Sequence, residues 1–350
     1  GYAFMLTALL SRLYGEFLPG GTSVCLKQEG SFLKPYRVGD EITALGEVTH
    51  VAEATRIVEI TCRMFRNGGE KIFEGAGLVR MEFHEVSATP LYESEGARLY
   101  PADFVKGLRD IGVVEGDVVF VHSDITVFGK LATKDRQVLL GGLVEALKQS
   151  VGEAGSIVMP TFTYSFCEGE SYNLRESPST TGVLTEYFRR SPGVVRSDHP
   201  IFSVACWGKK TRELVEVGTD SFDDHSVFGV LHGIDGKIVF LGAPFQSCTF
   251  LHHVEQGEGV PYRYMKTFTG IITDGSETRK ASSTFFVRDL KFDARLDGLG
   301  LDRHLTETGM MRRSSVGGGT VMAISAADLF EEGTRLLRDD PLAFLVRAKA

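Results

Sequence analysis

A histidine and a glutamate three residues apart, His252 and Glu255, are the side chains in this sequence best placed for acid–base chemistry. They follow an apolar run at 238–241 that is closed by Gly242 and Pro244, a pattern that indicates a buried strand running out into a loop. Residues three apart share one face of a helix, so the carboxylate can fix the tautomer of the imidazole and stabilise its protonated form. The spacing therefore indicates a general base at the mouth of a sheet.

The neighbouring residues leave other interpretations open. Thr249 has a side-chain oxygen that could cap the helix. Cys248 is a candidate nucleophile, although a nucleophile normally projects at its base from a separate segment. A metal site at His252, His253 and Glu255 is disfavoured, because adjacent helical side chains point about 100° apart and the H-E-x-x-H spacing is absent. By default a His-x-x-Glu pair is a surface or core pair, so the structural alternative also stays open.

Polar segments after other strand-like runs could bind a cofactor or a substrate. The loop at 122–130 could meet phosphate or a pantetheine chain through its backbone N–H groups, or it could be structural. Arg196 could pair with a phosphate or form a surface or packing ion pair. Asp223 and Asp224 are either turn residues or acceptors for a cationic amine.

Composition narrows the class of protein. The chain has 350 residues, so two domains are expected, and its net charge of -8 argues against a nucleic-acid binder and favours a cationic small molecule. Five cysteines without a C-x-x-C pair indicate a reducing compartment, the cytoplasm. No apolar run approaches the ~18 residues of a membrane span, so no membrane partner is expected. The chain begins at Gly1 rather than at a methionine, as expected of a partial chain.

The first 85 residues predict a helix followed by four strands. Apolar residues at helical spacing over 4–18 end at a Pro-Gly-Gly stop. The strand-like runs lie at 23–33, 41–51, 55–65 and 71–83. A helix followed by long antiparallel strands indicates an α+β unit. Residues 84–96 are polar and without period, which predicts a linker.

From residue 98 onward, helices alternate with short apolar strands. Helices are predicted at 102–108, 136–151, 182–190, 209–217 and 326–337, and strands at 117–121, 156–159, 202–207, 237–241 and 320–324. A hairpin is predicted from 267–273 and 280–288. The alternation indicates an α/β sheet whose ligands sit at the ends of its strands.

The segments FLPGG, FLKPYRVGDEI and NGGEKIFEGAGLV resemble part of a MaoC-like hot-dog domain, the fold of (R)-specific enoyl-CoA hydratases. The resemblance covers residues 1–83 and implies a partial hot-dog domain, because the catalytic Asp and His of that family lie upstream of the matched helix. Hydratase activity is the alternative to a half-domain that packs on the rest or completes a dimer. Hot-dog units usually dimerise, so a homo-oligomer is expected.

A second series of segments resembles the aminoglycoside 3-N-acetyltransferase family, the antibiotic N-acetyltransferases, over residues 98–345. The segments are HSDITVFG, VLLGGLVEALKQSVGEAGSIVMPTFT, SPSTTGVLTEYFRRSPGVVRSDHPIFSVACWG, HSVFGVL, GKIVFLGA and TFLHHVE. This resemblance implies an α/β domain over 97–350 that transfers an acyl group from acetyl-CoA, or another acyl-CoA, to the primary amine of an aminoglycoside or amino-sugar-like substrate. No metal is implied.

The resemblance also assigns residues. In the family motif N-T-S-L-H-x-A-E the histidine is the base and the glutamate its partner, which makes His252, Glu255 and Thr249 the expected catalytic residues. Cys248 and Phe250 replace the family's asparagine and serine and are expected in the substrate pocket with the two aspartates. Apart from the resemblance, the loops after the strand-like runs are expected to seat the acyl-CoA, and the residues expected at its site are His122, Ser123, Asp124, Gly129, Met159, Thr161, Phe162 and Arg196.

The sequence leaves two alternatives to this activity open. The chain could be a bifunctional biosynthetic enzyme whose hot-dog part hydrates an enoyl-CoA. It could also be a catalytically silent CoA-binding protein.

Overall fold

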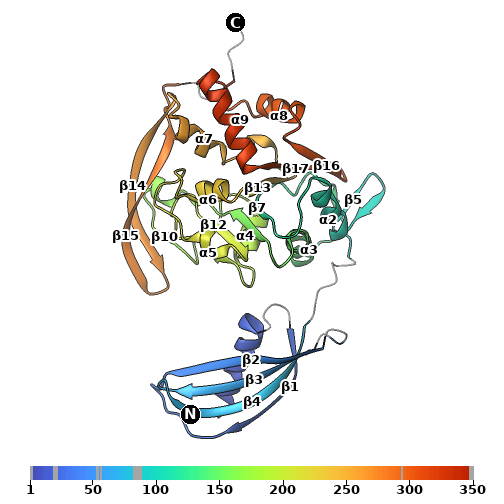
Figure 1. The fold of residues 1–350 in the computed structure, drawn as a ribbon, viewed down its shortest axis with the longest axis vertical. Coiled ribbons are helices and arrows are strands. Elements are labelled where there is room, and N and C mark those ends of the chain that lie inside the picture. The colour runs from blue at the N-terminus through green and yellow to red at the C-terminus, as the bar shows by residue number, and fades with distance from the viewer. Residues whose placement is uncertain are drawn as a thin grey trace. The chain divides into compact units, whose positions relative to one another are not determined.

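The computed structural model describes residues 3–18, 23–52, 55, 57–81, 89–292 and 295–346. Contacts divide the chain into two compact units, Gly1–Glu85 and Val86–Ala350, called unit 1 and unit 2 below. Figure 1 shows the elements of each unit.

Unit 1 is a helix packed on an antiparallel sheet. Helix α1 (Ala3–Arg12) continues as a π-helical segment η1 (Leu13–Phe17), and the sheet order is β1-β4-β3-β2. The strands are β1 (Ser23–Phe32), β2 (Ile42–Ala52), β3 (Ile57–Arg66) and β4 (Glu70–Met81). A Cβ atom at Gly77 would lie 2.3 Å from Oη of Tyr14, so the Tyr14 side chain packs directly on this glycine where the helix meets the sheet. The predicted helix and four strands are confirmed.

The predicted linker is only partly irregular. Residues 82–88 lie outside the described residues, but β5 (Tyr92–Ser94) pairs with β6 (Ala97–Leu99) and with β8 (Lys130–Leu131). Leu91 and Tyr92 are fully buried in a core of unit 2. The linker prediction is therefore wrong for its second half, because two buried residues in a short hairpin leave no detectable period.

A seven-stranded mixed sheet forms the centre of unit 2, in the order β11-β12-β9-β7-β13-β17-β16. β9, β7 and β13 are parallel to one another, and the remaining neighbours are antiparallel. The strands are β7 (Val118–Ser123), β9 (Ser156–Pro160), β11 (Val195–Arg196), β12 (Val204–Gly208), β13 (Lys237–Leu241), β16 (Arg312–Val316) and β17 (Gly319–Ser325). β16 was absent from the prediction because it is largely polar and exposed.

Side chains of the central strands alternate between two cores. Phe120 and Phe240 lie in one core, whereas Val121 and Val239 lie in the other, as the two-residue period of a strand requires. The second core is covered by α2 (Pro101–Asp110), α3 (Arg136–Val151) and α4 (Val183–Arg189). The first is covered by α5 (Thr211–Val215), α6 (Val227–Gly233), α7 (Leu251–Glu258), α8 (Gly298–Glu307) and α9 (Ala326–Asp339). The layered α/β fold predicted for this part is confirmed.

A long hairpin of β14 (Arg263–Asp274) and β15 (Glu277–Arg288) follows α7 and forms its own sheet with β10 (Tyr172–Asn173). Figure 1 shows it along one side of unit 2. Short 3-10 helices lie at η2 (Ser165–Cys167) and η3 (Phe245–Ser247). Among the described residues, no helix is long and apolar enough to span a bilayer.

The core beneath α7 supplies a stability test. Phe240 is completely buried between the rings of His122 and Phe245. We expect Phe240→Ala to lower the free energy of unfolding of unit 2 by about 3–5 kcal/mol, through lost apolar burial and the cavity left behind. Phe292→Ala is the matched control, because Phe292 is 43% exposed. Denaturant melts followed by circular dichroism check both, and an equal loss in the two variants would contradict the packing described.

Candidate active site

The loop from β13 to α7 lies at the carboxyl end of the parallel strands. β13 pairs with β7 in parallel, with Leu241 opposite Ser123. The chain then turns at Gly242, where φ is +77° and a Cβ atom would lie 2.2 Å from the carbonyl oxygen of Asp124. Only glycine tolerates both the left-handed backbone and this approach. The turn brings α7 next to the loop that leaves β7.

The predicted base and its carboxylate partner are hydrogen-bonded on α7. Nδ1 of His252 is 2.6 Å from Oε2 of Glu255. The Glu255 side chain is 2% exposed, whereas that of His252 is 26% exposed. A carboxylate accepts hydrogen bonds, so Nδ1 carries the hydrogen and Nε2 of the neutral imidazole keeps its lone pair.

Nε2 of His252 forms no hydrogen bond with any residue the structure describes. The ring packs edge-on against Phe222, with the ring centroids 5.1 Å apart. Burial, and then the nearby charge of Arg263, lower the pKa of His252 below its usual 6.5. The imidazole is therefore neutral at neutral pH, and its free nitrogen can take a proton from a ligand.

Two further side chains reach the Glu255 carboxylate. The hydroxyl of Tyr262 donates a hydrogen bond of 2.9 Å to Oε1, and Nε of Arg263 lies 2.8 Å from Oε2. Burial raises the pKa of Glu255, but the contacts with His252 and Arg263 outweigh it and hold the pKa below its ordinary value. Glu255 is thus an ionised, buried carboxylate.

Thr249 does not cap α7 through its side chain. Its carbonyl accepts the backbone N–H of His252 at 3.0 Å, and its hydroxyl donates to the carbonyl of Ser247 at 3.4 Å. The side-chain cap predicted from the sequence is wrong, because the helix begins two residues later with Phe250 at the N-cap. The backbone N–H of Thr249 points to Nε2 of His122 at 3.5 Å, which joins this loop to the end of β7.

The expected acyl-CoA residues at the end of β7 and in the loop that follows it divide into buried and accessible ones. His122 is buried with its ring stacked on Phe240, and burial lowers its pKa to about 3. It is therefore a neutral acceptor in the core and has no charge to offer a phosphate. Ser123 and Asp124 are partly exposed. Gly129 serves the fold, since a Cβ atom there would lie 2.5 Å from a carbonyl oxygen of the β5 hairpin.

The expected acyl-CoA residues near β9 are all buried. Met159 and Phe162 face the cores on the two sides of the sheet. The guanidinium of Arg196 donates to the carbonyl of Thr161 at 2.7 Å and to that of Ser177 at 2.6 Å, and its Nε lies 3.2 Å from the Thr161 hydroxyl. Its donors are thus committed to the protein. This geometry favours the packing alternative for Arg196 over pairing with a phosphate.

The two predicted substrate aspartates lie in the loop before α6. Oδ1 of Asp223 accepts the backbone N–H of His225 at 3.0 Å. Burial, and then the charge of Asp220, raise the pKa of Asp223. Asp224 is exposed. Both carboxylates thus stay available to a cationic group, and a cation near Asp223 would favour its ionised form.

Side chains of α7 fix this acidic loop in place, which sequence patterns did not reveal. Nδ1 of His253 bonds to the carbonyl of Phe222 at 2.7 Å, and Nε2 of Gln256 donates to Oδ1 of Asp220 at 2.8 Å. One face of α7 therefore carries the base and the next face holds the loop that packs against it.

Cys248 and Phe250 belong to the core. They are 3% and 0% exposed, and burial raises the pKa of the Cys248 thiol to about 12. A thiol with this pKa is not an active nucleophile at neutral pH. The structure places both side chains away from solvent, so it does not support their predicted contact with a substrate.

A family model described as aminoglycoside 3-N-acetyltransferase matches residues 120–338. Aminoglycoside N(3)-acetyltransferase IV of Salmonella sp is 30% identical over 249 residues, which cover 70% of this chain and 89% of the relative. The chain belongs to the aminoglycoside 3-N-acetyltransferase family. The family expected from the sequence motifs is confirmed.

Solved structures of this family have the same fold. The apoenzyme of aminoglycoside acetyltransferase AAC(3)-IVa has a TM-score of 0.60 and 26% identity, and the match covers 71% of this chain and 91% of that one. AAC-IIIb in a binary complex with CoASH has a TM-score of 0.61 at 21% identity, covering 71% and 98%. At 21% identity, the likeness to AAC-IIIb shows a shared fold and no more.

A shorter match supports the resemblance to a MaoC-like hot-dog domain. The (R)-specific enoyl-CoA hydratase of Aeromonas caviae is 40% identical over 80 residues. These residues make up 23% of this chain and 60% of the hydratase, so the chain matches less than two thirds of that relative's length. The match supports the partial MaoC-like part expected from the sequence.

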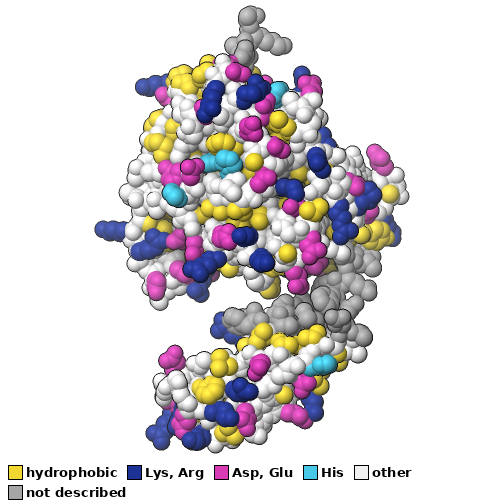
Figure 2. Space-filling model, in the orientation of Figure 1, with side chains coloured by type: hydrophobic (Ala, Val, Ile, Leu, Met, Phe, Trp, Pro, Cys, Tyr) yellow, Lys and Arg dark blue, Asp and Glu magenta, His cyan; other side chains and the backbone are white. Residues whose placement is uncertain are grey.

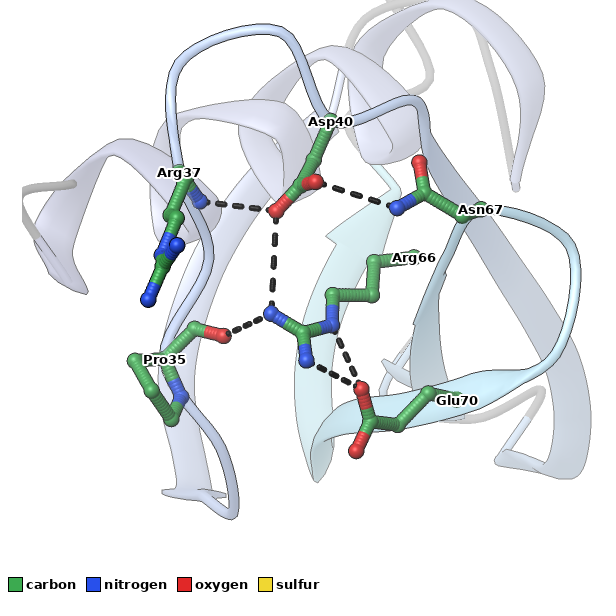
Figure 3. A pocket seen from close by; sticks show the side chains of 6 residues that line it. All are labelled: Pro35, Arg37, Asp40, Arg66, Asn67 and Glu70. Atoms are coloured by element: carbon green, nitrogen blue, oxygen red, sulfur yellow. Dashed lines mark hydrogen bonds and ion pairs between the residues drawn. The ribbon is translucent and has the colours of Figure 1, made fainter.

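The polar pocket of unit 1 shown in Figure 3 lies between a loop and the β3–β4 turn, and its polar side chains serve to hold these two segments together. Asp40 accepts the backbone N–H of Arg37 at 2.7 Å and the side-chain amide of Asn67 at 3.0 Å. Arg66 donates to the carbonyl of Pro35 at 2.8 Å and forms an ion pair with Glu70. The polar groups therefore bind one another and join the loop to the β3–β4 turn. Among the described residues, no cluster of metal-ligating side chains was found in either unit.

Cysteine labelling tests the placement of Cys248. Iodoacetamide is expected to modify Cys25, which is exposed, in the native protein and to spare Cys62, Cys206 and Cys248, which are buried. All five should react after unfolding. Peptide mass spectrometry measures the modified fraction at each site. Rapid labelling of Cys248 in the native protein would contradict its burial and restore it as a candidate nucleophile.

Proposed function

We propose that this enzyme transfers the acetyl group of acetyl-CoA to a primary amine of an aminoglycoside or amino-sugar-like substrate, with His252 as the general base. The observation that carries the proposal is the neutral imidazole of His252, which buried Glu255 holds through Nδ1, while Nε2 has no partner among the described residues and the side chain is 26% exposed. Two matched relatives are named aminoglycoside N(3)-acetyltransferases, which supports the substrate class. A solved neighbour holds CoASH, which supports the donor.

The proposed reaction is a direct transfer in a ternary complex. Nε2 of His252 takes a proton from the substrate nitrogen as that nitrogen forms a bond to the thioester carbonyl carbon. The carbonyl oxygen becomes an oxyanion, which Thr249 and nearby backbone N–H groups stabilise. The C–S bond then breaks, and the imidazolium returns its proton to the CoA sulfur. Glu255 stabilises the imidazolium in between.

In this proposal the acyl-CoA binds along the loops that leave β7 and β9. The link between Thr249 and His122 brings the β7 loop next to the base. Because His122, Thr161 and Arg196 are buried, these loops would contact pantetheine and pyrophosphate through backbone N–H groups and partly exposed side chains such as Ser123.

Charge favours a cationic substrate. The chain carries a net charge of -8, and Figure 2 shows acidic, basic and histidine side chains interspersed on the visible face of unit 2. The visible face shows no single basic stripe of the kind that tracks nucleic acid. We also propose a cytoplasmic enzyme, which the free state of all five cysteines supports. We further propose a homo-oligomer, because unit 1 resembles a hot-dog domain and hot-dog units usually dimerise.

Replacing the base tests the mechanism. We expect His252→Ala to lower kcat by about 10²–10⁴-fold, the usual effect of removing a general base. Acetyl-CoA should still bind, since the proposed donor loops are untouched. Released thiol measures turnover, isothermal titration calorimetry measures binding, and His50→Ala, at an exposed position of unit 1, is the control. Turnover at the wild-type rate in His252→Ala would refute this role.

Screening donors and acceptors separates the candidate activities. Acyl-CoA thioesters are tested with aminoglycosides and with nucleotide amino sugars, and free CoA is measured. Release that depends on the amine supports acyl transfer. No release with any amine indicates a silent CoA-binding protein, and loss of enoyl-CoA absorbance without an amine indicates a hydratase.

The acidic loop supplies a test of the substrate class. Asp224→Asn is expected to raise KM for a polycationic amine by about 2- to 5-fold with kcat unchanged, because an exposed ion pair contributes ~0.2–1 kcal/mol. The increase should shrink in high salt and disappear with a monoamine acceptor. Steady-state kinetics at two ionic strengths check this, and an equal change for both acceptors would contradict recognition by charge.

A further inference from the structure

The ion pair between Arg263 and Glu255 has no role in the mechanism proposed above. Arg263 is the first residue of β14 and lies eight residues after its partner. Its side chain is 12% exposed and that of Glu255 is 2% exposed. Two opposite charges this deeply buried interact strongly, since water screens them poorly.

The contact acts through charge rather than through a directed hydrogen bond. Nε of Arg263 is 2.8 Å from Oε2, but its N–H is not aligned with an acceptor among the described residues. The guanidinium is held from the other side, where Nη1 donates to the carbonyl of Phe286 on β15 at 3.2 Å. The hairpin therefore fixes a positive charge beside the carboxylate oxygen that His252 also binds.

Without the positive charge of Arg263, Glu255 would favour the protonated form of His252. A lone carboxylate 2.6 Å from Nδ1 favours the imidazolium, and a protonated imidazole cannot accept a proton from an amine. The charged and titratable groups that face the ring are Glu255 from α7 and Arg263 from β14, with Tyr262 behind the carboxylate. The acidic loop presents the uncharged ring of Phe222 to it.

We propose that Arg263 is a positioning residue that offsets the charge of Glu255, so that the carboxylate orients His252 without holding it in the protonated form. This inference rests on the proposed role of His252 as the base. Burial and the Arg263 charge both lower the pKa of His252, while Glu255 raises it, which agrees with the geometry.

Titration of His252 in the full chain tests the inference without any assay of activity. The protein is labelled with 13C-histidine, and the His252 signal is assigned by its absence in His252→Asn. Removing the cation should let the His252–Glu255 pair take up its first proton at higher pH. In Arg263→Gln we expect the midpoint to rise by about 1 pH unit or more, the usual effect of a charge at this distance. In Arg263→Lys, which keeps the charge, it should stay near wild type.

The pH dependence of kcat supplies the second readout. In Arg263→Gln the acid limb should move upward with the titration midpoint, while the rate above that limb is largely retained. A merely structural role would lower the rate at every pH and leave the limb in place.

Controls keep the outcomes distinct. Arg175→Gln removes an exposed arginine that pairs with Asp274 at the far end of the hairpin, and it should move neither readout. Arg263→Met replaces the charge with a side chain that suits a buried position, if Arg263→Gln does not fold. An unchanged or lowered midpoint in the folded neutral variants would overturn the inference. A raised midpoint in a protein that transfers no acyl group would overturn the proposed function alone.

Discussion

A buried carboxylate is the constraint around which the active-site elements are arranged. Glu255 lies almost wholly out of water, and an ionised group there is stable only if donors and charges surround it. His252 comes from the same helix, whereas Tyr262 and Arg263 come from the start of the hairpin that follows. The hairpin is thereby tied to α7. The placement of β13, α7 and β14 around one carboxylate gives the imidazole a single orientation.

Periodicity and punctuation predicted most elements but not their arrangement. Strong patterns located the helix at 136–151 and the strand at 237–241 with the bounds observed in the structure. β16 was not predicted because its residues are largely polar, and β5 was not predicted because it is only three residues long. The order of the seven strands, and the antiparallel strands that flank a parallel centre, depend on contacts between distant segments. Such contacts leave no trace in a local pattern.

The candidate site could be predicted only where its groups are local in sequence. His252 and Glu255 are one helical turn apart, so spacing alone placed them together. The sequence predicted that Arg196 binds a phosphate or forms an ion pair and that Thr249 caps a helix. In the structure the Arg196 guanidinium donates to backbone carbonyls, and Thr249 precedes the N-cap of α7. Arg263 was overlooked, because a buried acid's need for a cation becomes visible only once burial is known.

The state of the His252 imidazole at neutral pH tests the central claim most directly. Nitrogen-15 NMR of histidine-labelled protein distinguishes the two neutral tautomers and the imidazolium, with His252→Asn for assignment. The geometry predicts a neutral ring with hydrogen on Nδ1 and a free lone pair on Nε2. A ring protonated at Nε2, or at both nitrogens, would contradict the account of His252 as the base.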